Sequence, residues 1–152
     1  MTVQLASVTE DRPEPGRRPT AQVALRAAGY LIDVLPTILV GLLGLIPIAG
    51  PIMVGLVITP YWLLRDVTGA SLGKLALNMR VVAANGQPAS VASRLIRNVP
   101  LAIPGMFMIV PFLGIVVAPA IGLVIILIEA ISLFAQGRRV GDMLAGTTVV
   151  PK

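Results

Sequence analysis

The sequence contains neither cysteine nor histidine among its 152 residues. The lack of cysteine excludes disulfides, thiolate nucleophiles and cysteine-ligated metals. The lack of histidine removes the commonest metal ligand and the commonest general base. Charge is scarce as well, because charged residues make up 12% of the chain, where a soluble domain carries about a quarter. We therefore predict that the protein is not an enzyme, with no catalytic residues, no metal site and no cofactor.

What the chain has in place of these groups is apolar sequence, which makes up 56% of its residues. No lysine or arginine occurs between Arg26 and Arg65, or between Arg97 and Arg138. Each interval is long enough for two bilayer crossings of roughly 20 residues apiece. We therefore predict an all-α membrane protein with four transmembrane helices. Prolines and a glycine mark the turn in the second interval, at Pro111, Gly114 and Pro119, and the predicted spans are residues 21–46, 50–64, 97–110 and 117–134.

The positions of the lysines and arginines predict the orientation of the spans in the membrane. All 12 belong to the polar N-terminal segment, the connecting segment or the C-terminal tail, and the two predicted outer turns have none. The positive-inside rule then places both termini in the cytoplasm. The sequence pI of about 10.8 could indicate nucleic acid. Because the basic residues lie beside predicted spans, we expect anionic lipid head groups as the partner and no nucleic acid.

Domain organisation follows from the same pattern. Residues 1–20 are rich in proline and charge, which predicts a disordered cytoplasmic tail. Residues 21–150 form one membrane domain. We expect segment 65–96 and tail 135–152 to build a small cytoplasmic cap from a short amphipathic helix and short β segments.

Local patterns predict the elements of this cap. Asn85-Gly86 is typical of a tight turn and follows a β-prone run at Met79 to Ala83. We predict that Thr147 to Val150 pairs with Arg80 to Val82, and that Ser90 to Asn98 is the amphipathic helix. Gly69 to Lys74 resembles a phosphate-binding loop only superficially, since the glycine spacing and the residue after the lysine are wrong. We expect Lys74 to lie near lipid head groups instead.

Arg26 and Asp33 are the main candidate functional residues of the first span. Seven residues are about two helical turns, so the two side chains leave one face about 10.5 Å apart. An ionisable residue within a membrane helix is a functional-site hypothesis by default. Asp33 either clamps a neighbouring helix or binds a proton or cation, and Tyr30 could bridge it to Arg26. Pro36 lies one turn further on and predicts a kink beside the acid.

Glu129 is the second acid within a predicted span, in the inner half of the fourth. It could pair with Arg26 or Arg97, or extend toward the cytoplasm, and we favour such an extension over a catalytic role. Together with Asp33 and Tyr30 it makes up the candidate proton or ion site.

Several short motifs together resemble the RDD family of bacterial membrane proteins, which is named for one arginine and two aspartates. Arg26 and Asp33 match the first two signature residues, and Asp142 matches the third. The resemblance covers about residues 22–150 and implies a bacterial inner-membrane protein that could transport unknown ligands. Family members often carry histidine directly before the last aspartate, where this chain has Gly141. The other matching residues are Gly69, Leu72, Gly73, Lys74, Arg80, Val81, Val82, Asn85, Gly86, Arg97, Asn98, Arg138, Arg139, Ala145, Gly146 and Thr147.

We expect the signature residues to form a structural clasp at the cytoplasmic face, in which Asp142 pairs with Arg26 or Arg97 beside Arg138 and Arg139. Two functions remain open. The favoured one is an accessory or assembly subunit that stabilises a larger membrane complex, with another membrane protein or a second copy of the chain as partner. The alternative is a proton- or cation-coupled transporter of an unknown ligand that uses Asp33, most simply as an oligomer, because four packed helices leave little room for a path.

Overall fold

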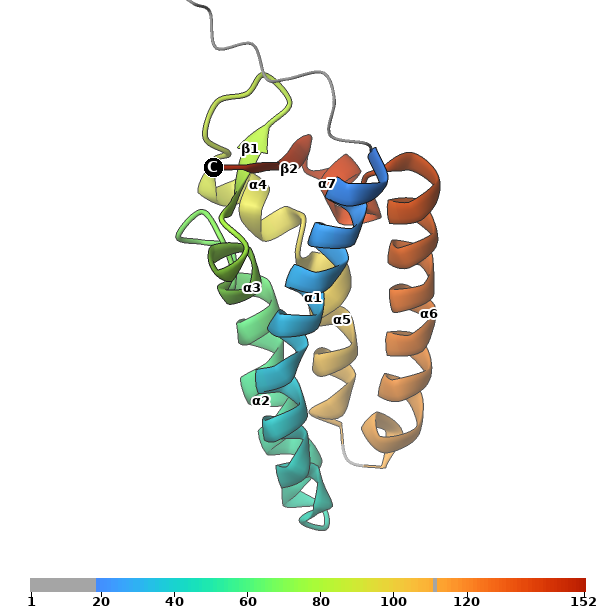
Figure 1. Cartoon of the computed structure of the whole chain (residues 1–152). Helices are drawn as coiled ribbons and strands as arrows, with labels where there is room; N and C mark the ends of the chain where they lie inside the picture. The colour runs from blue at the N-terminus through green and yellow to red at the C-terminus, as the bar shows by residue number, and fades with distance from the viewer. Residues whose placement is uncertain (1–18, 111) are drawn as a thin grey trace, which may run out of the picture.

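The computed structural model describes residues 19–110 and 112–152, and in these residues helices run along one long axis with a small cap at one end (Figure 1). The predicted disordered tail falls largely on residues 1–18, which lie outside the described part. Residues 19 and 20 are helical, because α1 spans Pro19–Gly41. The helix continues through Pro36 and ends in a 3₁₀ turn, η1, at Leu42–Leu45.

α2 (Ala49–Leu64) runs back toward the cap and packs against α5 (Val99–Met108), which in turn packs against α6 (Leu113–Gln136). The small buried core between these helices comprises Trp62, Leu101 and Ala102. Close helix contact requires glycine at one point, because a Cβ on Gly105 would lie 2.6 Å from the hydroxyl of Thr59. α2 and α5 are therefore in close contact at this point.

The cap is built from the short helices α3 (Leu72–Ala76), α4 (Val91–Ile96) and α7 (Val140–Leu144) and the strands β1 (Met79–Ala83) and β2 (Thr147–Pro151). The strands form an antiparallel pair in which Val81 lies opposite Val149 and Val82 opposite Thr148. The predicted pairing of these two runs is therefore confirmed, as is the short helix before Asn98. In α4 the hydroxyl of Ser90 caps the helix by accepting the amide of Ser93 at 3.1 Å.

Helix boundaries in the second apolar interval differ from those predicted. α5 ends at Met108 and α6 already begins at Leu113, so Gly114 and Pro119 lie within α6 rather than in the turn. Pro119 is the seventh residue of α6, so its missing amide removes one intrahelical hydrogen bond, and the helix continues through it. The turn needs only the short segment between the two helices.

Two segments among the described residues are long and apolar enough to cross a membrane, Gln22–Leu45 and Gly114–Gln136. α2 and α5 are apolar but shorter. The polar ends of all four helices that meet the cap carry the charged side chains discussed below.

Candidate functional site

Asp33 is a buried carboxylate that joins three segments. Its Oδ1 accepts the backbone amide of Gly73 at 2.7 Å. Its Oδ2 accepts the hydroxyl of Ser71 at 2.6 Å and the guanidinium of Arg65 at 3.1 Å. The residue is 1% exposed. Asp33 thus holds α1 to the end of α2 and to the start of α3.

The contact between Asp33 and α3 depends on glycine. The first amides of a helix have no intrahelical partner, and Gly73 is the second residue of α3, so its amide is free to donate to the carboxylate. A Cβ at Gly73 would clash with the carbonyl oxygen of Gly29. The lack of a side chain at Gly73 therefore allows the backbone of α3 to touch that of α1, and Asp33 caps α3 from another helix.

Glu129 caps α7 in the same way. Its Oε1 accepts the amide of Gly141 at 3.1 Å, and Gly141 is again the second residue of its helix. A Cβ at Gly141 would clash with the carbonyl oxygen of Arg97. Glu129 is 5% exposed, so the prediction that it extends toward the cytoplasm is wrong. The free amide of α7 offers it a closer partner inside the fold.

These two units form an internal repeat. The segments SLGKLALNMRVV and RVGDMLAGTTVV can be aligned with Gly73 matching Gly141, 68 residues apart in the sequence. In each, a five-residue helix is followed two residues later by a residue with positive φ, which is Asn78 at 52° or Gly146 at 60°. A strand begins directly after that residue. Val81 and Val149 match in the alignment and also face each other in the sheet. The repeat is therefore a pseudo-two-fold arrangement centred on that pair.

The position after the glycine in each repeat carries opposite charges, Lys74 and Asp142. Lys74 donates to Asp66 at 2.7 Å and to the hydroxyl of Ser71 at 2.9 Å. Asp66 also accepts the amide nitrogen of Asn98 at 3.2 Å and lies 3.7 Å from Arg97. Lys74 is 6% exposed, so the prediction that it lies near lipid head groups is wrong. An aspartate next to the last turn of α2 holds it inside the cap.

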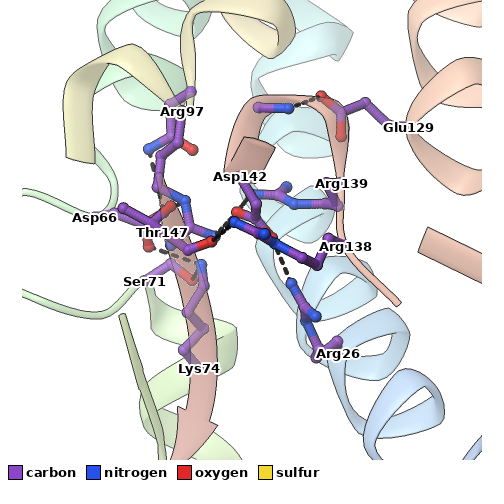
Figure 2. A network of polar contacts seen from close by, with 12 residues as sticks. Arg26, Asp66, Ser71, Lys74, Arg97, Glu129, Arg138, Arg139, Asp142 and Thr147 are labelled. Atoms are coloured by element: carbon purple, nitrogen blue, oxygen red, sulfur yellow. Dashed lines mark hydrogen bonds and ion pairs between the residues drawn. The ribbon is translucent and has the colours of Figure 1, made fainter. Parts of the chain in front are cut away.

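Asp142 is the acid on which the most arginines converge (Figure 2). Arg97 lies 2.5 Å from its Oδ1, Arg139 lies 3.6 Å from the same oxygen, and Arg26 pairs with Oδ2. Arg26 also donates to the carbonyl of Gly137 just past the end of α6, where the helix dipole favours a cation. Arg26 therefore links α1 to both α6 and α7.

Opposite charges outweigh burial at the two acids of the cap. Burial alone would raise the pKa of Asp66, but Lys74 and Arg97 hold it well below its usual range. Burial would likewise raise the pKa of Asp142, and Arg139 and Arg97 lower it below its ordinary value.

The pKa values of the buried cations shift in both directions. Burial and the nearby Arg65 lower the pKa of Lys74 to about 7, and burial and Arg139 lower that of Arg97 to about 10. Burial would also lower the pKa of Arg139, but Asp142 and Glu129 raise it above its usual value. Crowded cations thus disfavour the charge on Lys74 and Arg97 despite their acidic partners.

Tyr30 and Arg138, the remaining candidates, make contacts outside these ion pairs. Tyr30 does not bridge Arg26 and Asp33, and it instead packs on Trp62 with ring centres 5.5 Å apart. Arg65 covers the Trp62 ring with its guanidinium carbon 4.4 Å from the ring centre. Arg138 donates to the carbonyl of Thr147 at 3.0 Å. The clasp around Asp142 therefore includes Arg26, Arg97 and Arg139. Asp33 pairs with Arg65 and is connected to the clasp through Ser71, Lys74 and Asp66.

Sequence reasoning missed Asp66, Arg65, Ser71 and the two capping glycines as parts of the network. The repeat would have revealed the glycines, because Gly-Lys and Gly-Asp recur in the same context before two strands that were predicted to pair. Nothing in the local sequence points to Asp66, because its partners come from α3 (Lys74) and from the junction of α4 and α5 (Arg97 and Asn98).

The network can fix helices relative to one another, since each of its four acids joins segments far apart in the chain. In the part of the chain that the structure describes, no group of three acidic, histidine or cysteine side chains could hold a metal ion. The arrangement is that of ion pairs and capped helix ends.

Comparison with known proteins gives one match. The family model described as the RDD family matches residues 19–146, which cover the bundle and most of the cap. Neither the curated proteins nor the solved structures gave a match.

Proposed function

The chain belongs to the RDD family, whose members are membrane proteins, and from this premise we propose that it is an accessory subunit that stabilises a larger membrane complex. The observation that carries the proposal is that the buried acids all have partners within this chain. Asp33, Asp66, Glu129 and Asp142 each accept a donor from this same chain, and all are buried. A carboxylate that holds two helices together is poorly placed to exchange ions with each turnover.

We further propose four spans, α1, α2, α5 and α6, with the cap and both termini in the cytoplasm of a bacterial inner membrane. The described lysines and arginines gather at the cap end, and η1 and the turn before α6 have none, which supports this orientation. α5, with 10 residues, is only about 15 Å long against a hydrocarbon core of about 30 Å. A short span of this kind is accommodated when the bilayer thins locally.

The outer surfaces of α1 and α6 supply the area on which a membrane partner would lie. Leu39 is 69% exposed and Phe134 is 69% exposed, on helices that pack little against each other. Lipid or a partner helix covers such side chains in a membrane, and packing between small and apolar side chains is what drives helix association there.

Purification in a mild detergent tests the proposal. An affinity-tagged chain at native abundance should bring down a larger membrane protein at a fixed ratio, measured by quantitative mass spectrometry of the eluate. A tagged, unrelated four-helix protein of similar abundance is the control. Recovery of the chain alone, or of a homo-oligomer with only non-stoichiometric contaminants, contradicts the accessory role.

A proton- or cation-coupled transporter is the second candidate, and Glu129 now supports it better than Asp33. Its Oε2 has no hydrogen-bond partner, and the residue lines a cavity between α1 and α6. The purified protein in liposomes would then move protons or cations along an imposed gradient. Glu129→Gln, which keeps an oxygen for Gly141, should abolish that movement, whereas unchanged flux would exclude Glu129 as the coupling group.

A further inference from the structure

A cavity of about 270 Å³ lies between α1 and α6 at the cap end, and its walls are unusually rich in cations. Arg26, Lys74 and Arg139 line it, together with Arg65 and Arg97 from the ends of α2 and α4. These five side chains come from well-separated parts of the sequence, so the fold concentrates them at one place.

The acids around the cavity leave this positive charge incompletely balanced. Asp33 and Glu129 also line the cavity, and Asp66 and Asp142 pair with its cations from behind. Five cations therefore face four carboxylates, an excess of one positive charge. Burial and, after it, Arg65 lower the pKa of Lys74 to about 7, and an anion bound in the cavity would favour its charged form.

Three of the arginines retain unused donors. Nε of Arg65 and Nη1 of Arg97 are buried without a hydrogen-bond partner. Nη2 of Arg139 also lacks a hydrogen bond, and its nearest acidic oxygen is Oδ1 of Asp142 at 3.6 Å. The side chain of Arg97 is fully buried, and that of Arg65 is 2% exposed. A buried guanidinium N–H without an acceptor is costly, and phosphate oxygens match the geometry of this group well. An anion with several acceptor oxygens would therefore satisfy these donors.

The rest of the cavity is apolar and opens sideways. Leu31 and Phe134 line it and are 68% and 69% exposed, on the outer surfaces of α1 and α6. A second cavity, about 390 Å³ in volume and lined almost wholly by apolar side chains, shares Tyr30 and Ile126 with the first. A ligand that fits both has a charged head and an apolar chain.

We propose that these two cavities form a binding site for one anionic phospholipid, with its phosphate at Arg65, Arg97 and Arg139 and an acyl chain between α1 and α6. The excess of one positive charge matches one phosphodiester. A zwitterionic lipid adds an ammonium group next to the same cations, which weakens its binding. A water-soluble phosphate would gain nothing from the apolar walls. The site is independent of the accessory role, since it needs no protein partner.

Native mass spectrometry of the purified full chain in detergent tests this inference. The protein is titrated with phosphatidylglycerol, with phosphatidylcholine of the same acyl chains, and with free glycerol phosphate. We expect one phosphatidylglycerol per chain, bound at least tenfold more tightly than phosphatidylcholine, and no retained glycerol phosphate. Equal binding of the two lipids, or binding of glycerol phosphate as tight as that of the lipid, overturns the proposal.

Two variants locate the site. Arg139→Gln leaves Asp142 its partners Arg26 and Arg97 and should reduce the preference for phosphatidylglycerol at least fivefold. Ala130→Phe fills the cavity wall without touching an ion pair and should weaken phosphatidylglycerol binding at least tenfold. Ala135→Phe is the matched control, because Ala135 is exposed on the same helix and does not line either cavity. Thermal unfolding of each variant verifies folding, and unchanged lipid binding in a folded Ala130→Phe variant also overturns the proposal.

Discussion

The carboxylate of Asp33 accepts the backbone amide of Gly73 at 2.7 Å, and this single bond joins the first long helix to the cap 40 residues later. Glu129 and Gly141 repeat the arrangement at the other long helix. Both long apolar helices are thus connected to the cap by an acid that caps a short helix. The protein thus uses the acids of its two long apolar helices to join them to the cap.

Removal of the Asp33 charge should destabilise the fold strongly. Asp33→Asn leaves Arg65 buried without its carboxylate, and breaking a buried pair in this way costs about 3–5 kcal/mol. Thermal unfolding in detergent, followed by circular dichroism, measures the loss. Thr37→Val is the matched control one turn along α1, because the Thr37 hydroxyl is buried without a partner and its replacement should change stability by less than about 1 kcal/mol. Equal unfolding midpoints for the two variants would contradict the role of Asp33 in joining α1 to the cap.

Glycine should be required at Gly141. Gly141→Ala places a Cβ against the carbonyl of Arg97, and overpacking of this kind costs roughly 1–3 kcal/mol. Gly41→Ala, at the end of α1, meets no atom within 4 Å and should be neutral or slightly stabilising. The two unfolding midpoints, compared in the same detergent, check the prediction, and a tolerated Gly141→Ala would disprove the close approach.

Acid should destabilise the protein through Asp66 and Asp142. Both have a folded-state pKa below the ordinary value of 3.8, so their stabilising contribution is complete above about pH 4 and is lost as the pH falls below it. Unfolding midpoints measured between pH 6 and pH 3 should therefore fall. Asp66→Asn should be less stable at pH 6 and show a shallower fall. A variant with the wild-type pH dependence would show that Asp66 does not contribute.

Alkali should have the opposite effect through Lys74. The pKa of Lys74 is about 7 in the fold and 10.5 in the unfolded chain, so the unfolded chain binds more protons between these values. Stability should consequently rise with pH above about 7, by at most about 1.4 kcal/mol per pH unit. Lys74→Met should remove the rise, and Arg80→Met, which alters an exposed cation of β1, should retain it. Midpoints recorded from pH 6.5 to pH 9.5 distinguish the two.

The sequence by itself determined that the chain is a helical membrane protein of the RDD family, and it determined the pairing of the two strands. Long uncharged intervals and their basic flanks depend only on composition, and the β-prone runs at Met79 and Thr147 are local patterns. The sequence also indicated Arg26, Asp33 and Asp142 as signature residues, because each lies in a short motif that resembles the family's.

Only the tertiary structure decided which charges meet. Asp33 could have bound an ion, and it is instead occupied by Arg65, Ser71 and Gly73, none of which is near it in sequence. Glu129 could have reached water, and the free amide of Gly141 holds it inside. The physical reason is that an unpaired charge in a low-dielectric interior is so costly that its partner is set by whichever donor packing brings close, and packing is a property of the whole fold.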